Sequence, residues 1–321
     1  MAKFIKKIQN FSSQYELWNK GSKIIIGVSG GPDSVCLLGV LVFLAEKYNF
    51  QLQIAHVNYG LRGKDSLADE KLVKQLGEKY QLKVNILRPK NILQKGNLEN
   101  TLRDLRYAYF EKLRLALVFD FIAVAHNQND QAETVLMRII RGAGLNGLAA
   151  MRPRVGKIIR PLLQTSRTEI VNFLKEKGLT YRMDKSNAEN DIFRNKLRNE
   201  TLPYLEKNFN QSILETLSNF SFAVADDYAF MEKSAAGFVS AVCSKKKASF
   251  LEQDFLALDK AIQRQALRQI FLKLSGQFKD VEYNHIEELR KIIKSSKSKL
   301  KNARVGGLKI SKKGAKIEIF V

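Results

Sequence analysis

The chain of 321 residues is long enough for two domains, and a hydrophobic fraction of 45% excludes a predominantly disordered protein. Its 54 lysines and arginines against 32 aspartates and glutamates give a formal net charge of +22. This predicts a polyanionic partner such as RNA, DNA or an anionic membrane, unless it reflects a lysine-rich composition alone. Two distant cysteines exclude a disulfide framework, no apolar run is long enough for a membrane span and no secretory signal is visible, so we expect a cytoplasmic protein.

Strand-like and helical segments alternate over the first half of the chain. This alternation predicts an α/β fold, with a parallel sheet and helices on both of its faces. Because ligands of such sheets bind at the carboxyl ends of the strands, polar residues that follow the strands should share one crevice. The predicted strands are Lys23–Val28, Gln51–Val57, Lys83–Leu87 and Asp120–Ala125, and the predicted helices are Ser34–Tyr48, Leu67–Tyr80, Leu98–Leu117 and Asp130–Arg141.

The first predicted strand runs directly into a glycine-rich turn, Ser29-Gly30-Gly31-Pro32-Asp33-Ser34. The two glycines allow a ligand to approach the backbone closely, and the helix that follows aims free N–H groups and its positive dipole end at the turn. A phosphate group fits such a turn, although the spacing and the lysine of a Walker loop are absent. An ordinary glycine-rich turn between a strand and a helix is the alternative.

Acidic residues follow another strand end. Asp130 and Glu133 are three residues apart at the start of a predicted helix, so both carboxylates lie on one helix face. Together with Asp33 they could bind Mg²⁺, which prefers oxygen ligands and bridges phosphates. The alternative is that they only stabilise the helix N-terminus, which requires no ligand.

Basic residues and histidines complete the predicted crevice. Arg103 and Arg106 share a helix face, and guanidinium groups match phosphate geometry, but Arg103 could also simply pair with Glu99 on a solvated face. His56 and His126 both end strands, where hydrogen bonding to a substrate or to the backbone is a better interpretation than metal ligation.

The pattern becomes mainly helical in the last third. A polar stretch, Asp184–Asn195, is either a loop over the site or a surface loop, and a long amphipathic helix over Asn210–Lys233 leads out of the first domain. We therefore predict two domains, residues 1–210 and residues 211–321, the second smaller, mostly helical and ending in a β-hairpin. Its predicted elements are helices over Leu258–Leu274 and Val281–Ile293 and strands at Lys309-Ile310 and Ile317–Val321.

Basic residues are dense between the last predicted helix and the hairpin. Their density is too high for a folded interior, and their charge suits phosphate groups, which position a nucleic acid without reading its sequence. A solvated tail without a partner is the alternative. The residues predicted to contact RNA here are Arg290, Lys291, Lys294, Lys297 and Lys301.

Taken in order, these motifs resemble those of the tRNA(Ile)-lysidine synthetase family, which belongs to the PP-loop superfamily of N-type ATP pyrophosphatases. That family carries S-G-G-x-D-S, H-x-N-H-x-L-R, E-x-x-x-R-x-x-R-Y, A-H-H-x-D-D-Q-x-E-T, R-G-x-G-x-x-G-L, R-P-L and D-x-S-N with R-N-x-x-R. This chain matches the set over roughly its first two thirds. It departs from the motifs at Tyr59, Asn127 and Asn129, which leaves the roles of those three positions open.

The resemblance implies a fold like that of the adenine nucleotide alpha hydrolases and an ATP-dependent ligase. Its substrates would be ATP, L-lysine and tRNA(Ile) with a CAU anticodon, with Mg²⁺ as cofactor and no membrane partner. AMP would first be joined to the wobble cytidine, and the ε-amine of lysine would then displace it at C2 to give lysidine. A homodimer is compatible with the sequence.

The resemblance also implies roles for individual residues. ATP would be bound by Ser29, Gly30, Gly31, Pro32, Asp33, Ser34 and His56. Asp33, Asp130 and Glu133 would hold Mg²⁺ or orient the attacking amine, with Asp33 and Asp130 as metal ligands. Arg103, Arg106 and Arg194 would stabilise phosphate charge, and Arg62 and Arg198 would contact tRNA.

Two other functions remain open. A related PP-loop enzyme could thiolate a tRNA base, but sulfur transfer generally uses paired or cluster-binding cysteines, and this chain has one cysteine in each half. The chain could also be a nucleotide-dependent RNA-binding protein without catalytic activity. Acidic residues predicted beside the phosphates argue against that function, because binding alone does not require them.

Overall fold

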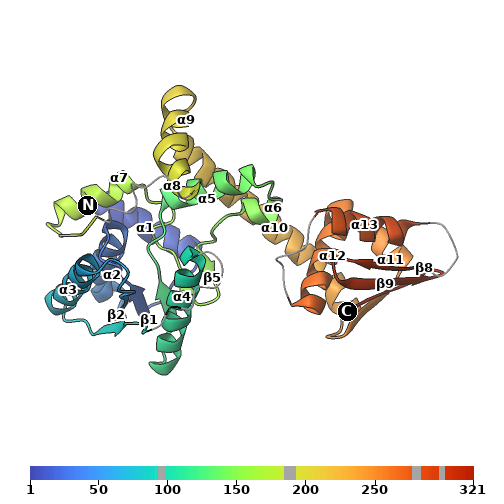
Figure 1. Ribbon diagram of the computed structural model, residues 1–321, viewed down its shortest axis with the longest axis horizontal. Helices are drawn as coiled ribbons and strands as arrows, with labels where there is room; N and C mark the ends of the chain where they lie inside the picture. Colours follow the sequence, from blue (N-terminus) through green and yellow to red (C-terminus); the bar gives the residue numbers. More distant parts are fainter. Residues whose placement is uncertain (91, 93–97, 184–192, 277–282, 296–300) are drawn as a thin grey trace. The chain divides into compact units, whose positions relative to one another are not determined.

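Helix α10 (Ile213–Val242) carries the boundary between two structural units of the chain (Figure 1). The first unit comprises Met1–Gly142 and Ala150–Phe222, and the second comprises Ala143–Ala149 and Ala223–Val321. Within the described part of the chain, no helix is both long and apolar enough to cross a membrane. The computed structural model describes residues 1–90, 92, 98–183, 193–276, 283–295 and 301–321.

The first unit is built on a six-stranded sheet with the order β3-β2-β1-β4-β6-β5. All neighbouring strands are parallel except β5, which runs antiparallel to β6. The predicted parallel sheet is therefore confirmed. The strands are β1 (Lys23–Gly27), β2 (Gln51–Val57), β3 (Val84–Leu87), β4 (Phe121–Ala123), β5 (Arg154–Val155) and β6 (Ile158–Ile159).

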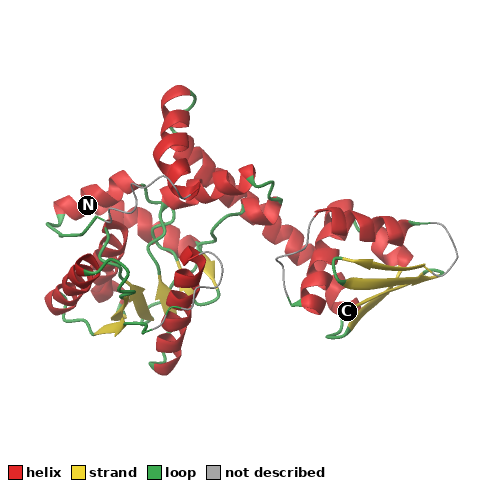
Figure 2. Ribbon diagram, viewed as in Figure 1, coloured by secondary structure: helices red, strands yellow, loops and turns green. Residues whose placement is uncertain are grey.

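Helices lie on both faces of this sheet because alternate residues of each strand point to opposite sides. Ile24 and Ile26 pack into a core with α1, α2, α3 and α7, whereas Ile25 packs with Phe110 of α4 in a separate core. Figure 2 shows the sheet between these helices. The helical segments are α1 (Ala2–Gln14), α2 (Pro32–Tyr48), α3 (Lys64–Lys79), α4 (Leu98–Ala116), α5 (Gln128–Ile140), α7 (Arg167–Glu176), α8 (Phe193–Lys196), the π-helical η2 (Leu197–Thr201) and α9 (Leu202–Asn208).

The second unit contains a four-stranded antiparallel sheet with the order β7-β10-β9-β8 (Figure 2). The predicted terminal hairpin is confirmed as β9–β10, but β7 and β8 extend it into a larger sheet that the sequence pattern did not indicate. The elements of this unit are α6 (Leu145–Leu148), the second part of α10, β7 (Lys247–Leu251), α11 (Glu252–Leu256), α12 (Lys260–Ser275), α13 (Tyr283–Lys294), β8 (Lys301–Val305), β9 (Leu308–Lys313) and β10 (Lys316–Phe320).

The two faces of this second sheet differ in polarity. Leu308 and Ile310 of β9 are buried in a core with residues of α12 and α13, while Lys309 and Lys313 are exposed on the opposite side. Lys312 lies on the buried side and is only 3% exposed. Its ammonium donates to the Glu252 carboxylate at 2.6 Å and to the carbonyls of residues 293 and 295, at 2.6 and 2.8 Å, which closes the end of α13.

Candidate active site

The turn between β1 and α2 is held in shape by hydroxyl groups. The Ser34 hydroxyl accepts a hydrogen bond from the Ser29 backbone N–H at 3.1 Å and donates to the Gly31 carbonyl at 2.9 Å. Gly30 has a φ of 95°, a left-handed conformation that favours glycine. Pro32 begins α2, where free backbone N–H groups are directed at the turn. This geometry suits an anion such as a phosphate.

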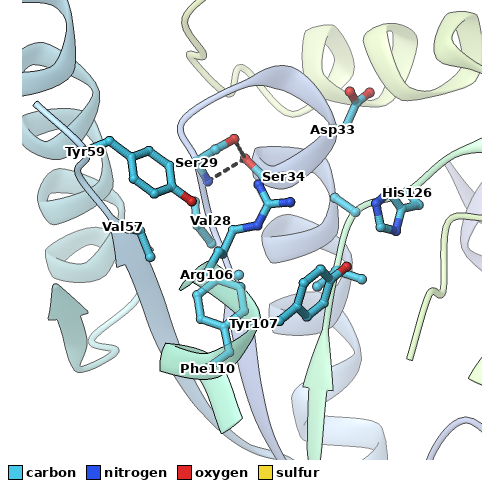
Figure 3. A pocket seen from close by; sticks show the side chains of 13 residues that line it. Val28, Ser29, Asp33, Ser34, Val57, Tyr59, Arg106, Tyr107, Phe110 and His126 are labelled. Atoms are coloured by element: carbon cyan, nitrogen blue, oxygen red, sulfur yellow. Dashed lines mark hydrogen bonds between the residues drawn. The ribbon is translucent and has the colours of Figure 1, made fainter. Parts of the chain in front are cut away.

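A cavity of about 210 Å³ lies at the carboxyl ends of β1, β2 and β4 (Figure 3). Gly27 forms part of its wall, where a Cβ atom would lie 2.8 Å from the Phe110 ring, closer than side chains normally approach. The strand ends, the turn and α4 thus enclose one space, in agreement with the expectation that polar residues after the strands share one crevice. Residues with polar groups that line it are Ser29, Asp33, Ser34, Tyr59, Arg106, Tyr107 and His126.

His56, which the sequence predicted to bind ATP, does not line this cavity. It is buried, and its Nδ1 lies 2.8 Å from the Val28 carbonyl at the base of the turn, so the ring supports the turn from behind. Burial lowers the pKa of His56, so the ring is neutral and Nδ1 carries the proton that is donated to Val28. Its Nε2 is buried and has no hydrogen-bond partner among the described residues.

Asp33 lies at the start of α2 and lines the cavity. Its Oδ2 accepts a hydrogen bond from Arg167 at 3.1 Å, and Asn129 supports this arrangement by accepting the Arg167 backbone N–H at 3.0 Å. Burial raises the pKa of Asp33, the Arg167 guanidinium opposes that rise and the Asp130 carboxylate adds to it. The other oxygen, Oδ1, is buried and has no partner within the described chain. Such an atom is a candidate contact for a cation or a ligand donor.

Asp130 and Glu133 form a compact charge cluster with two arginines, Arg194 of α8 and Arg198 of η2. Arg194 donates to Glu133 at 2.8 Å and to Asp130 at 3.2 Å, and Arg198 donates to the same carboxylates at 2.5 and 3.1 Å. Glu133 is 2% exposed, so these guanidinium groups compensate the cost of burying its charge. The structure therefore brings Arg198, predicted to contact tRNA, together with the predicted catalytic residues.

Asp130 also caps its own helix. Its Oδ2 accepts the Asn127 backbone N–H at 3.1 Å, and the Asn127 side chain accepts the Asp130 backbone N–H at 3.0 Å. This reciprocal pair is a capping box at the N-terminus of α5. Capping uses Oδ2, whereas Oδ1 faces Arg194 and Arg198, so capping and the predicted role in the site do not compete for one oxygen.

His126 joins the cavity wall to a buried arginine. Arg160 is 6% exposed and donates from Nε to His126 Nδ1 at 3.1 Å, and it is anchored by a bond of 2.9 Å to the Arg152 carbonyl. Burial lowers the pKa of His126 well below its ordinary value, and the surrounding arginines lower it further. Since an arginine is always a donor, Nδ1 must be the acceptor and the proton lies on Nε2.

Helix α4 contributes the basic wall of the site. The guanidinium groups of Arg103 and Arg106 both lie 5.7 Å from the centre of the Tyr107 ring. Arg106 and Tyr107 point into the cavity in Figure 3, whereas Arg103 is exposed beside it. Tyr59, one of the departures from the family motif, follows β2, lines the cavity and donates its hydroxyl to the Leu102 carbonyl of α4 at 2.8 Å.

The remaining residues predicted to contact RNA have varied environments. Arg62 is paired with Asp69 at 2.7 Å in the first unit. In the second unit, Arg290 is paired with Glu287 at 2.7 Å, while Lys291 and Lys294 are exposed on α13. Lys297 lies outside the described residues, as do residues 184–192 of the polar stretch, and of Lys301 only the backbone, at the start of β8, is described.

Three residues that the structure brings to the cavity, to its wall residue His126 or to Asp33 were not among the predicted site residues: Tyr107, Arg160 and Arg167. His126, for which its position at a strand end predicted a hydrogen bond to a substrate or to the backbone, lines the cavity. The motif Arg160-Pro161-Leu162 was a signal for Arg160, whereas nothing in the sequence indicated Arg167, which is brought to Asp33 only by the packing of distant segments.

The sequence model of the PP-loop domain matches residues 1–205. The chain belongs to the PP-loop domain family. Its relatives include the tRNA(Ile)-lysidine synthase of Clostridium tetani, 37% identical over 301 residues that cover 91% of this chain and 64% of that protein. The corresponding synthase of Clostridioides difficile is 38% identical over 301 residues, covering 91% and 65%. The resemblance inferred from the motifs is thereby confirmed, and this PP-loop protein spans about 64% of the length of the first of these relatives.

A solved structure supports the assignment of the fold. The U34-tRNA thiolase NcsA from Methanococcus maripaludis, determined with its 4Fe–4S cluster, superposes with a TM-score of 0.60 and 20% sequence identity over 70% of this chain and 79% of that one. At this level of identity the likeness concerns the PP-loop fold alone. Neither cysteine of the present chain lines the cavity, because Cys36 is buried in α2 and Cys243 belongs to the second unit.

Proposed function

We propose that this protein is a tRNA(Ile)-lysidine synthase. It would use ATP to join free L-lysine to C2 of the wobble cytidine of tRNA(Ile) with a CAU anticodon. The observation that carries this proposal is the proximity of two features in one unit. These are a cavity below a phosphate-binding turn and the charge cluster of Asp130, Glu133, Arg194 and Arg198. The named relatives and the basic composition support it.

ATP would place its phosphates at the turn and its nucleoside in the cavity. The cytosine O2 would attack the α-phosphorus, the bond to the β-phosphate would break, and pyrophosphate would leave. Charge develops on the departing oxygens in this step, so fixed donors there lower the barrier. We assign this role to the turn and to Arg106, with Arg103 beside it.

The residues around Asp33 fit Mg²⁺. The buried Oδ1 of Asp33 lacks a partner within the described residues, and the Asp130 carboxylate is near enough to raise the pKa of Asp33. No group of three acidic, histidine or cysteine side chains suited to a metal occurs among the described residues. Mg²⁺ commonly takes only one or two protein carboxylates and completes its shell with phosphates and water. When bound, it would neutralise charge on the phosphates.

Free lysine would bind at the charge cluster. Two carboxylates can accept its ammonium groups, and two guanidinium groups can bind its α-carboxylate in a bidentate manner. The ε-amine, after losing a proton to a carboxylate of the cluster, would attack C2 of the cytosine while the bond from C2 to the AMP oxygen breaks. Arg198 therefore has a better role here than on tRNA phosphates, because both carboxylates already engage its guanidinium.

We further propose that basic residues outside this site, including the exposed Lys291 and Lys294, bind tRNA phosphates. We propose that the reaction takes place in the cytoplasm. The competing function, base thiolation, lacks support from the cysteines: burial raises the pKa of Cys36, so its thiol stays protonated and unreactive.

Mass analysis of tRNA nucleosides tests the proposal directly. The protein is incubated with tRNA(Ile), ATP, Mg²⁺ and isotopically labelled lysine, and the digested nucleosides are examined. A cytidine that carries the labelled lysine supports the proposed function. A thiolated base would favour the alternative enzyme, and unmodified tRNA with ATP-dependent binding would favour a non-catalytic protein.

A further inference from the structure

We propose that the helix-free face of the sheet in the second unit binds the sugar–phosphate backbone of RNA. This surface, which carries Arg304, Lys309, Lys313 and Lys316, is the open face of the sheet. It deepens the proposed function, on which it rests for the identity of the RNA as tRNA. It shares Arg304 with the basic stretch that the sequence indicated between the last predicted helix and the hairpin, but its other cations, Lys309, Lys313 and Lys316, lie on β9 and β10.

The register of the strands defines the open face. In β9, Leu308, Ile310 and Lys312 are buried on the helix side, so Lys309 and Lys313 point the other way. Arg304 of β8 lies opposite Lys309, and Lys316 of β10 lies opposite Lys313. Figure 2 shows the helices of this unit gathered on one side of the sheet. Long cationic side chains are thus collected on the side that the helices leave uncovered.

These pairings would be unfavourable without a bound anion. Like charges directly opposite each other on an antiparallel sheet destabilise it, and the open face contains two such pairs, Arg304 with Lys309 and Lys313 with Lys316. Among the described residues, Glu318 is the one acidic side chain on the face, and it is already paired with Lys247 and Lys316, each at 3.2 Å. Arg304, Lys309 and Lys313 form no ion pair with any described residue.

The open face is also hollowed. A depression of about 470 Å³ is lined by residues of β8, β9 and β10, including Arg304, Lys309 and Phe320. The Lys309 ammonium lies 5.8 Å from the centre of the Phe320 ring, which holds the charge over the depression. A concave surface with several unpaired cations and an aromatic ring matches a phosphate backbone better than a flat anionic surface, so the proposed occupant is RNA.

The experiment compares two triple variants of the full chain. Arg304, Lys309 and Lys313 are replaced by glutamine in one variant. Lys233, Lys260 and Lys273, which are exposed on helices of the same unit, are replaced by glutamine in the matched control. The affinity for tRNA is measured over a salt series. Each lost phosphate contact lowers the salt slope by about 0.7 to 0.9, so the open-face variant should lose roughly two units of slope and bind on the order of tenfold more weakly at low salt.

Several outcomes separate the possibilities. Slopes that coincide for the wild type and the open-face variant, or an equal loss in the control variant, would overturn the proposal. The proposal would also be overturned if vesicles of anionic phospholipid bound the wild type more tightly than tRNA does and lost this binding in the open-face variant. Rescue of binding by Lys309→Arg and Lys313→Arg would support charge, rather than fold, as the cause. A wild-type chain that shows the open-face dependence but forms no lysidine would support this surface while refuting the proposed function.

Discussion

The Nε of Arg160 donates a hydrogen bond to the Nδ1 of His126, and this contact fixes Nε2 as the ring nitrogen that carries the proton. His126 therefore presents an uncharged N–H donor to the cavity instead of a cation. Arg160 acts through His126 and is a positioning residue in the proposed mechanism.

The pH dependence of stability should report this arrangement. The pKa of His126 is lowered well below 6.5 in the folded state by burial, so the unfolded chain binds more protons as the pH falls below 6.5. Its contribution to stability is present above that pH and is lost progressively below it. His126→Gln should make the fall in melting temperature between pH 7 and pH 5 less steep than in the wild type. An unchanged slope would mean that His126 already titrates normally in the folded protein.

Asp130→Asn should lower lysidine formation by on the order of 100-fold or more while the fold is retained, because the charge at Oδ1 is lost. The matched control is Glu169→Gln, since Glu169 closes an equivalent capping box in α7 and pairs with Lys7 away from the cavity. Both variants should have similar melting temperatures, and only Asp130→Asn should lose activity. Equal activity in the two variants would leave Asp130 as a capping residue alone.

The two glycines of the turn should respond differently to alanine. Gly30→Ala should lower the free energy of unfolding by about 1 to 3 kcal/mol, because φ is 95° there. Gly31 has a φ of −75°, and a Cβ atom would lie 3.5 Å from the Ser29 hydroxyl, so Gly31→Ala should leave stability unchanged while weakening ATP binding. Denaturant titration and ATP titration measure these effects. A destabilisation of both variants to the same degree would contradict this account of the turn.

ATP–pyrophosphate exchange should depend on tRNA and Mg²⁺ but not on lysine, because the cytosine is proposed to accept AMP before lysine reacts. The assay follows labelled pyrophosphate into ATP with each component omitted in turn. Strong exchange with lysine in the absence of tRNA would show that lysine itself is adenylated, and the proposed order of steps would be wrong.

Two neighbouring parts of α13 should behave differently. Replacing Lys291 and Lys294 by glutamine should weaken tRNA binding and lower the salt slope by about one unit per lost contact, since both side chains are exposed. Arg290→Gln should instead lower thermal stability, because Arg290 is paired with Glu287 and donates to Gln263. A change in melting temperature for the lysine variant with no change in affinity would reverse these assignments.

Four of the six strands in the sheet of the first unit were predictable because each is a short and largely apolar run, whereas the two-residue strands β5 and β6 were not predicted. The predicted Gln51–Val57 has the bounds of β2, and the other three strands differ by at most two residues at an end. The strands β7 and β8 were not predictable in the same way. The strand β7 pairs with β10, for example Leu251 with Lys316, far away in sequence. Local periodicity carries no information on such a partner.

In the candidate site, too, some features follow from the local sequence pattern and others depend on contacts between distant segments. The convergence of the turn, Asp33 and His126 follows from parallel strand ends, which the alternation of elements indicated. The contacts of Arg167 with Asp33 and of Arg198 with Glu133 depend on how α7 packs against α2 and how η2 packs against α5. Spacing along the chain cannot predict those contacts, because the partners are 134 and 65 residues apart.

The buried ammonium of Lys312 has a consequence for how the second sheet assembles. Side chains alternate across a strand, so a slip of β9 by one residue would exchange its two faces. Lys309 and Lys313 would then enter the apolar core without the carboxylate and carbonyls that Lys312 now contacts, and Leu308 and Ile310 would be exposed to water. A misaligned β9 would therefore be destabilised both by buried, unpaired ammonium groups and by exposed apolar side chains. The contacts of Lys312 thus favour the observed register of the sheet over its alternatives.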